Sequence, residues 1–193
     1  MTEIKVLAIG GSTRPNSSSE RALHIAAAGA AKAGAAVTTI TGRDLILPIY
    51  DTELDERDPK AIALIDAIRS AHGLIISSPG YHGGMSGMMK NALDYIEDLR
   101  DEDPTYLDGR AVGLIAVAHG WQATVSTLTQ LRQVTHALRG WPTPLGGAVN
   151  SSTTRLTDDG SDAEAATQDQ LQSIGAQVVA FARMQRGPVA PTS

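Results

Sequence analysis

The 193-residue chain carries 16 Lys and Arg against 21 Asp and Glu, for a formal net charge of −5. This balance, with no cluster of basic residues, argues against a nucleic-acid partner. No apolar run approaches the roughly 20 residues that a membrane-spanning helix needs. The chain has no cysteine, which excludes disulfides, thiolate catalysis and cysteine metal sites. We therefore expect a cytoplasmic protein with no nucleic-acid partner, no membrane partner and no metal site.

Short apolar segments alternate with helix-forming segments along the whole chain. The predicted strands are residues 4–9, 36–40, 74–77, 111–118 and 145–149. The predicted helices are residues 19–33, 59–71, 85–99, 125–138 and 162–185. Because the strands are almost continuously apolar, they are expected to be buried on both faces, as in a parallel sheet covered by helices.

This alternation predicts a doubly wound α/β fold: a five-stranded parallel sheet in the flavodoxin-like order 2-1-3-4-5, with helices on both faces. We expect one domain over residues 1–186 and a flexible C-terminal tail at 187–193. Ligands of such sheets bind beyond the carboxyl ends of the strands, where the strand order reverses. The loops after the first, third and fourth strands should therefore share one crevice.

The first of these loops is rich in hydroxyl groups and lies directly before a helix. It lacks both the Gly-x-Gly-x-x-Gly spacing of a dinucleotide site and the Gly-Lys-Ser/Thr ending of a nucleoside-triphosphate loop. Hydroxyls and backbone N–H groups at a helix N-terminus suit a phosphate dianion, and an arginine adds a charge-assisted hydrogen bond. The alternative is that one serine only caps the helix and the arginine is solvated surface. The candidate phosphate ligands are Ser12, Arg14, Ser17, Ser18 and Ser19.

The second loop has little side-chain bulk for its length, so its backbone can approach a flat ligand closely. It follows the third predicted strand, at the expected switch point of the sheet. An ordinary strand-to-helix turn is the alternative, with the tyrosine packed on the core and the histidine on the surface. The candidate ring-binding residues are Pro79, Gly80, Tyr81, His82 and Gly83.

The third loop follows the fourth strand and brings His119 and Gly120 toward the same crevice. Trp121 beside them could equally be a subunit contact. Large apolar residues follow both ligand loops, and core packing is their default interpretation, with a dimer contact as the second. These residues are Met85, Met88, Met89, Trp121, Val125 and Leu128.

At these residues the chain resembles the NADPH-dependent FMN reductase family of flavodoxin-like proteins. The family pattern Gly-Ser-x-Arg-x-x-Ser-x-Ser/Asn is matched by Gly11, Ser12, Arg14, Ser17 and Ser19. The second pattern, Pro-x-Tyr followed by Gly-x-x-Lys-Asn-x-Leu-Asp, is matched by Pro79, Tyr81, Gly87, Lys90, Asn91, Leu93 and Asp94. Many members carry an acid and an asparagine flanking the tyrosine, where this chain has Gly80 and His82.

The resemblance implies FMN as cofactor, with the serine-rich loop on its phosphate and the second loop on its isoalloxazine ring. It implies NADPH or NADH as co-substrate and a small-molecule acceptor such as free flavin, a quinone or an azo compound. The flavin itself carries the electrons in such enzymes, so we name no catalytic side chain. The competing interpretation is a flavodoxin-like electron carrier without NAD(P)H reductase activity of its own. A homodimer, or a tetramer built from dimers, is also expected.

Overall fold

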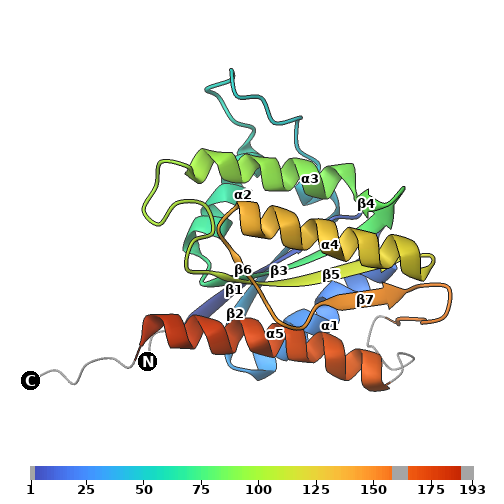
Figure 1. Ribbon diagram of the computed structural model, residues 1–193. Helices are drawn as coiled ribbons and strands as arrows, with labels where there is room; N and C mark the ends of the chain where they lie inside the picture. Colours follow the sequence, from blue (N-terminus) through green and yellow to red (C-terminus); the bar gives the residue numbers. More distant parts are fainter. Residues whose placement is uncertain (1–2, 158–164, 188–193) are drawn as a thin grey trace, which may run out of the picture.

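The computed structural model describes residues 3–157 and 165–187, which are arranged around one twisted sheet (Figure 1). The strands in these residues are β1 (Ile4–Gly10), β2 (Ala35–Thr41), β3 (Gly73–Tyr81), β4 (Gly84–Met85), β5 (Ala111–Ala118), β6 (Trp141–Pro142) and β7 (Gly147–Asn150). The α-helices are α1 (Ser18–Lys32), α2 (Pro59–Ser70), α3 (Gly87–Asp94), α4 (Trp121–Ala137) and α5 (Ala165–Arg186). Two short 3₁₀ helices, η1 (Gly42–Leu45) and η2 (Tyr95–Leu99), complete the pattern.

The sheet order is β2-β1-β3-β5-β6, with β7 also paired to β5 and all of these pairs parallel. This confirms the doubly wound flavodoxin-like order predicted from the sequence. The count of five strands is wrong in two respects. A short strand, β4, pairs with β3, and the fifth strand is divided into β6 and β7, which pair with opposite ends of β5. Between them lies Pro144, which has no N–H to donate to the ladder.

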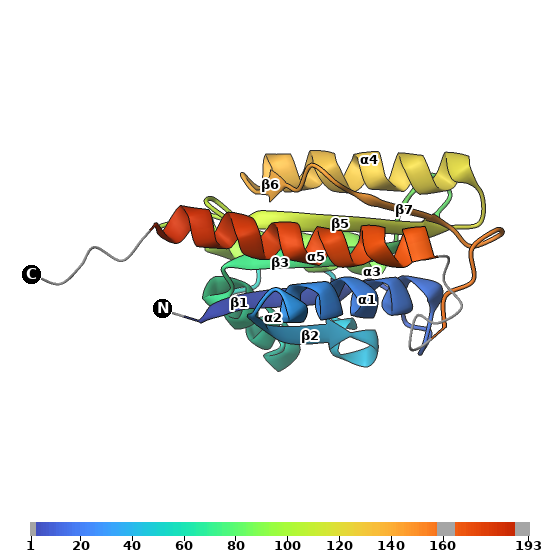
Figure 2. The same ribbon diagram turned by 90° about the horizontal axis from the view of Figure 1, so that it is seen from below.

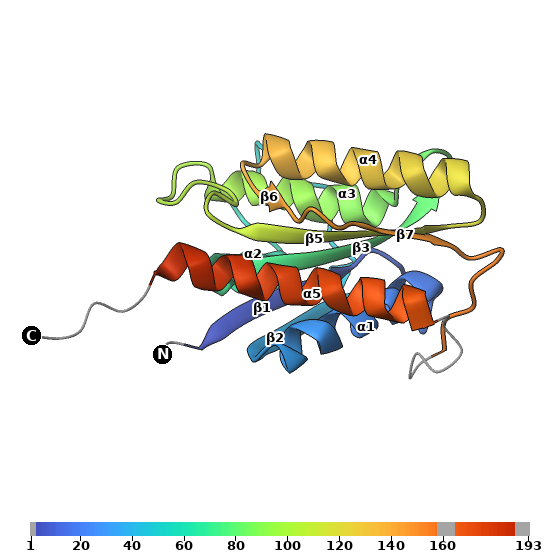
Figure 3. The same cartoon turned by 60° about the horizontal axis from the view of Figure 1, so that its bottom comes forward.

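Helices cover both faces of the sheet (Figures 2 and 3). Alternate residues of β1 face opposite layers: Leu7 and Ile9 pack in the core beneath α2, α3 and α4, whereas Val6 and Ala8 pack in the core beneath α1 and α5. Both sides of the strand are therefore buried, which explains why its sequence is apolar at almost every position.

The largest local differences from the predicted elements lie around β3. This strand continues to Tyr81, and Gly80 and Tyr81 pair in antiparallel fashion with Met85 and Gly84 of β4. Helix α3 consequently begins at Gly87 rather than 85, and it ends at Asp94 before the 3₁₀ turn η2. The loop that was expected to bind a ring is thus a tight hairpin.

Helix α4 begins at Trp121, one turn earlier than the predicted start at 125. The predicted start of the last helix, residue 162, and residues 188–193 of the predicted tail lie outside the described residues. The prediction of one domain over residues 1–186 stays a prediction. None of the helices in the described part of the chain is long and apolar enough to cross a membrane.

Candidate functional site

The loop after β1 is fixed to β3 and to the start of α3 by the backbone of Gly11. The Gly11 N–H donates to the carbonyl oxygen of Ser77 in β3 at 2.9 Å. The Gly11 carbonyl oxygen accepts from Oγ of Ser86, the N-cap of α3, at 2.7 Å. Both backbone groups of this residue are therefore bonded to the residues that flank the second candidate loop.

Two serines of the first loop organise the N-terminus of α1. Ser17 is the N-cap residue, and its Oγ accepts the Glu20 N–H at 3.2 Å. Ser19 is buried, its Oγ lies 3.1 Å from Ser17 Oγ, and its carbonyl oxygen accepts from Ser77 Oγ at 2.7 Å. The capping role considered for one serine is confirmed for Ser17.

The same helix end keeps free hydrogen-bond donors. Within residues 3–157 and 165–187, no acceptor is found for the N–H groups of Thr13, Ser17 and Ser18. The Arg14 side chain is exposed and its guanidinium has no acidic partner in the same residues. The Arg14 N–H donates to Ser12 Oγ at 3.2 Å, which folds this stretch into a turn. Unpaired amides and a free cation at a helix N-terminus fit a phosphate group.

Glu20 contributes to the order of this loop and was not among the predicted site residues. Its carboxylate accepts from the Asn16 N–H at 2.8 Å and from Thr41 Oγ1 at 2.9 Å. The sequence signal was present, because Ser17-x-x-Glu20 is the spacing of a capping box. The structure differs from the usual box in that the glutamate bonds to Asn16, the residue before the N-cap.

The second loop is a two-residue β-turn at the tip of the β3–β4 hairpin. His82 has a φ of 51° and Gly83 a φ of 87°, the positive values typical of a type I′ turn. Tyr81 is 58% exposed and His82 is exposed, so Tyr81 does not pack in the core. The hairpin thus presents an aromatic ring and an imidazole on its outside.

Gly80, near the end of β3, is packed closely against β5 and α4. A Cβ at this position would stand 2.6 Å from Thr127 Oγ1 and 3.0 Å from Ala118 Cβ, so only glycine fits without displacement. Thr127 is fully buried, and its hydroxyl has no hydrogen-bond partner in the described residues. Close packing against α4 therefore sets the position of the hairpin base.

The third loop is shaped by Gly120 and by a residue that the sequence did not indicate. Gly120 has φ 111° and ψ 145°, a region that glycine alone adopts readily. Its N–H donates to Asn150 Oδ1 at 2.8 Å. The same oxygen accepts from the N–H and Oγ of Ser152, at 3.0 and 2.7 Å. Asn150 is buried at the end of β7, and no spacing in the sequence connects it with Gly120.

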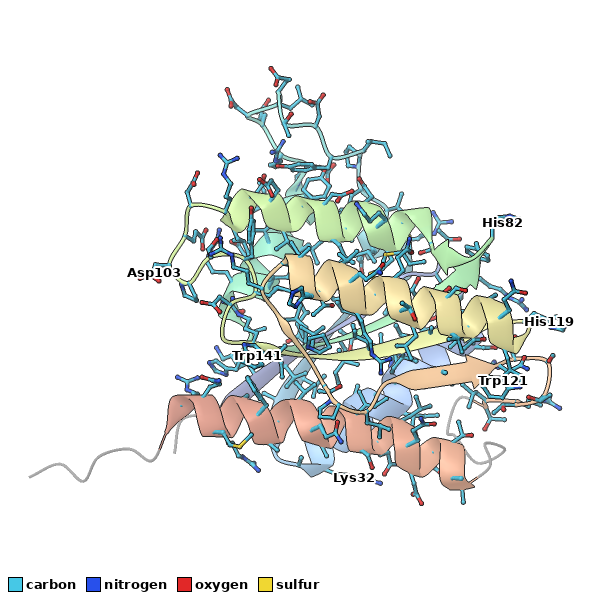
Figure 4. The ribbon with its side chains drawn as sticks, viewed as in Figure 1. Lys32, His82, Asp103, His119, Trp121 and Trp141 are labelled. Atoms are coloured by element: carbon cyan, nitrogen blue, oxygen red, sulfur yellow. The ribbon has the colours of Figure 1, made fainter. Side chains whose placement is uncertain are left out.

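The second and third loops enclose a cavity of about 470 Å³. His82 and Gly83 line it from the hairpin, and His119, Gly120 and Trp121 line it from the start of α4. Figure 4 shows His82, His119 and Trp121 at the same end of the molecule. The predicted meeting of these two loops is confirmed. The first loop and residues 79–81 are not among the residues that line this cavity.

Asn91, which matches the second family pattern, has a structural role outside this cavity. Asn91 Oδ1 accepts the Tyr50 N–H at 2.8 Å, and its Nδ2 donates to the Pro48 carbonyl oxygen at 2.7 Å. Asn91 therefore holds the long link between η1 and α2 against α3. In Figure 1 this link projects beyond the body of the molecule.

An ion pair with aromatic neighbours secures the same link. Arg57 donates to both carboxylate oxygens of Asp98 at 2.8 Å, and its guanidinium lies 4.9 Å from the Tyr50 ring centroid. The Arg57 hydrogen bonds hold the pKa of Asp98 below its usual range. Partial burial, with the hydrogen bond to Asp98, raises the pKa of Tyr50.

In the described part of the chain, no three His, Cys, Asp or Glu side chains are grouped to hold a metal ion. The loops after β1, β3 and β5 lie at the carboxyl end of a flavodoxin-like sheet, with phosphate-type donors on one and a cavity between the other two. These features define a flavodoxin-like α/β protein with its candidate ligand loops at the carboxyl end of the sheet.

The sequence profile of the NADPH-dependent FMN reductase family matches residues 4–154, and the chain belongs to this family. It is 31% identical over 86 residues to the NADPH azoreductase of Bacillus sp. (strain OY1-2), covering 44% of this chain and 45% of that protein. It is 32% identical over 96 residues to the FMN-dependent NADPH-azoreductase of Staphylococcus haemolyticus (strain JCSC1435), covering 50% and 47%. The matched segments thus span about half the length of these curated relatives.

Solved structures agree on the fold over almost the whole chain. The flavoenzyme NAD(P)H:(acceptor) oxidoreductase from Paracoccus denitrificans aligns with a TM-score of 0.74 and 17% identity, covering 93% of this chain and 97% of that one. The flavodoxin, WrbA-like protein from Agrobacterium tumefaciens aligns with a TM-score of 0.64 and 18% identity, covering 95% and 99%. The flavodoxin-like fold is therefore established beyond the segment that the family profile matches.

Proposed function

We propose that this chain is an NAD(P)H-dependent oxidoreductase that uses bound FMN to move electrons to a small-molecule acceptor. The observation that carries the proposal is the N-terminus of α1, where amides without acceptors share a loop with an Arg14 guanidinium that has no acidic partner, as far as residues 3–157 and 165–187 are concerned. Such a loop suits a dianionic phosphate. Membership of the family favours FMN over other phosphate ligands.

In this proposal the three loops divide the cofactor between them. FMN would supply the redox chemistry when bound, as a two-electron acceptor for the hydride of the nicotinamide and a two-electron donor to the acceptor. The protein binds and orients the cofactor, and no side chain is assigned a proton transfer. The phosphate is assigned to Ser12, Arg14, Ser17, Ser18 and Ser19. The ring is assigned to Pro79, Gly80, Tyr81, His82 and Gly83 on one side and to His119 and Gly120 on the other.

The acceptor is proposed to be an azo compound, a quinone or a free flavin, because curated relatives are azoreductases. Each two-electron step takes one hydride from NADPH or NADH and one proton from solvent. The acceptor therefore gains two electrons and two protons per step. The rates of flavin reduction by NADPH and by NADH, compared at equal concentration, determine the preference between them.

Anaerobic mixing tests the function directly. The purified protein with FMN should lose its visible flavin absorption when NADPH or NADH is added without any partner enzyme. The absorption should return when an azo dye or a quinone is added. Protein whose flavin is reduced only after a separate reductase is added would be an electron carrier instead. Gel filtration beforehand separates a tightly held cofactor from one that is released.

We also infer a homodimer, or a tetramer built from dimers. Support comes from Tyr81, Trp121 and Val125, which are 58%, 57% and 54% exposed on neighbouring parts of the hairpin and α4. The interpretation as dimer contacts is wrong for three of the apolar residues. Met85, Met89 and Leu128 are buried against the sheet, in agreement with their default interpretation as core residues. The apolar area outside the core is accordingly smaller than expected from the sequence.

Light scattering at micromolar concentration tests this inference. Val125→Glu should lower the mass toward that of the monomer. Ala28→Glu, an exposed position on α1 beneath the opposite face of the sheet, is the matched control and should leave the mass unchanged. A wild-type monomer mass with flavin bound and activity intact would contradict the inference.

We also propose a cytoplasmic location and a single domain over residues 1–186. Fractionation of cells tests the location, and limited proteolysis tests the domain. Cleavage confined to the last residues, with the remainder intact, is the expected result of the second test.

A further inference from the structure

A second cavity, of about 350 Å³, lies at the edge of the sheet between β6 and α5. We call it the edge cavity. Most of its wall is formed by the side chains of Trp141, Pro142, Pro144, Phe181 and Met184. A volume of this size is within the range of small-molecule sites, which are mostly apolar and carry a few polar groups. Since a cavity of about 150 Å³ holds benzene, the edge cavity has room for a bicyclic ring system.

The edge cavity is remote from the three ligand loops. Trp141 pairs with Ala111, the first residue of β5, whereas the third loop follows Ala118, the last residue of that strand. The ends of an eight-residue strand are roughly 23 Å apart. Figure 4 accordingly shows Trp141 well separated from His82 and His119. The residues assigned to FMN therefore form a different site.

The lining of the edge cavity carries no charge. Among the described residues that line it, none has an ionisable side chain. Two arginines adjoin lining residues in the sequence, but their guanidinium groups are engaged elsewhere. Arg110 donates to the carbonyl oxygens of Tyr106 and Ala71, and Arg183 donates to that of Ala33. Because an ion would lose its hydration here without gaining a charged partner, an uncharged molecule is favoured.

Two side chains provide a flat surface and an adaptable one. The ring centroid of Trp141 lies 5.7 Å from that of Phe181, with the ring planes at 37° to each other. Despite this contact, Trp141 is 55% exposed, and its indole face suits a flat ring. Met184 is 71% exposed, and its flexible thioether adapts to ligands of different outline.

Two hydrogen-bond donors at the edge cavity have no acceptor. Gln177 Oε1 accepts the Leu145 N–H at 3.2 Å. Since an N–H group can only donate, this bond fixes the orientation of the amide and leaves its NH₂ group available. Within residues 3–157 and 165–187, no acceptor is found for Gln177 Nε2 or for the indole N–H of Trp141. A ligand with a carbonyl oxygen would satisfy one of these donors.

The backbone at this edge does not suit an added strand from another chain. The N–H groups of Trp141 and Thr143 donate to β5 and its neighbour, at the carbonyl oxygens of Arg110 and Val112. The alternate residues are Pro142 and Pro144, which have no N–H to donate. The outer edge therefore lacks the donors that pairing with a further strand requires.

We propose that the edge cavity is a second binding site, specific for an uncharged bicyclic aromatic compound that carries a carbonyl oxygen. Trp141 and Phe181 contact the rings, and the NH₂ group of Gln177 donates to the carbonyl oxygen. No redox step takes place at this site. The inference does not depend on the proposed function, so a protein without NAD(P)H-dependent activity would still bind such a compound.

Nuclear magnetic resonance tests the site directly. The chain has two tryptophans, so its nitrogen–proton correlation spectrum contains two indole N–H signals, and Trp121→Phe identifies that of Trp141. With FMN saturating, 2-naphthamide should shift the Trp141 signal and leave the Trp121 signal in place. Its dissociation constant should be about tenfold lower than that of 2-naphthoate, which has the same rings but a negative charge.

Gln177→Glu tests the proposed donor. Glutamate keeps an acceptor for the Leu145 N–H but has no NH₂ group, and the spectrum of the variant reports whether it is folded. The affinity for 2-naphthamide should fall about tenfold. Gln172→Glu, on the same helix but outside the edge cavity, is the matched control, since glutamate keeps the acceptor for Lys32 Nζ. Its affinity should stay within about twofold of the wild type.

Several results would overturn the proposal. A Trp141 signal that does not move at millimolar 2-naphthamide would show that no site exists. A shift of the Trp121 signal alone would place the probe near the ligand loops. A Trp141 signal that moves on dilution without a probe would assign the surface to contact between two copies of the chain. Equal affinity for the two probes, or no loss in Gln177→Glu, would contradict the chemistry assigned to the cavity.

Discussion

Ser86 Oγ donates a hydrogen bond to the Gly11 carbonyl oxygen at 2.7 Å and accepts one from the Met89 N–H at 3.1 Å. One buried hydroxyl thus caps α3 and fixes the loop after β1. The link joins the candidate phosphate loop to the hairpin of the candidate ring site, although the residues are separated by most of two β-α units. The relative position of the two loops therefore depends on Ser86, a side chain that is assigned to neither the phosphate site nor the ring site.

Ser86→Ala should therefore affect both stability and cofactor binding. Loss of the cap and of one buried hydrogen bond should lower the free energy of unfolding by about 1–3 kcal/mol. The loop after β1 should also become less ordered, which weakens FMN binding. Urea unfolding without FMN and a fluorescence titration with FMN measure the two effects. Unchanged values in both experiments would show that the link has no role. Ser173→Ala, an exposed serine within α5, is a control for the substitution itself.

Gly80 and Thr127 should be energetically coupled. Gly80→Ala places a Cβ at 2.6 Å from Thr127 Oγ1, and such overpacking is expected to cost about 1–3 kcal/mol. Thr127→Ala removes the obstructing hydroxyl, so the double variant should be more stable than the sum of the single effects predicts, by about 1 kcal/mol. A double-mutant cycle from urea unfolding checks this. Additive effects would indicate that the two groups do not approach each other as closely as in the structure.

Asp98→Asn should destabilise the protein in a pH-dependent way. Because hydrogen bonds from Arg57 lower the pKa of Asp98 in the folded state, its contribution is complete above the unfolded pKa of about 3.9 and is lost as pH falls through the folded value. Near pH 7 the variant should be less stable by about 1.5–3 kcal/mol. As the pH falls below the pKa of Asp98 in the folded state, the two proteins should converge. Unfolding measured near pH 7 and in a series of acidic buffers tests the sign.

Asp94→Asn is the matched control for that experiment. Its pair with Lys90, at 2.6 Å, lies on the exposed surface of α3 at the i,i+4 spacing. Such pairs contribute about 0.3–0.5 kcal/mol. A cost for Asp94→Asn as large as that for Asp98→Asn would indicate that the difference in burial between the two pairs is unimportant.

The order of strands and helices could be predicted because each apolar segment contains its own periodicity. Residues 4–9 and 111–118 are apolar on both faces, and only a central strand of a covered sheet buries both. The capping role of Ser17 was likewise visible in local sequence. The division of the fifth strand was not, because β6 and β7 are defined by which parts of β5 they pair with.

The parts of the site that sequence reasoning missed depend on contacts between distant segments. Asn150 orders Gly120 from thirty positions away, and Ser86 reaches Gly11 across the switch point. The apolar residues after the second loop were ambiguous for a related reason. The pattern of Met85, Met88 and Met89 does not say which of them faces the sheet until the hairpin fixes where α3 begins.

The loop after β1 is proposed to hold the phosphate of FMN, and a comparison of FMN with riboflavin tests this assignment most directly. Both ligands share the ring, but riboflavin has no phosphate. Arg14→Ala should weaken FMN binding by one to two decades, the loss of one charge-assisted hydrogen bond worth about 1.5–3 kcal/mol. Riboflavin binding should change less than about twofold. Equal loss for the two ligands, or no loss for FMN, would contradict the assignment of this loop.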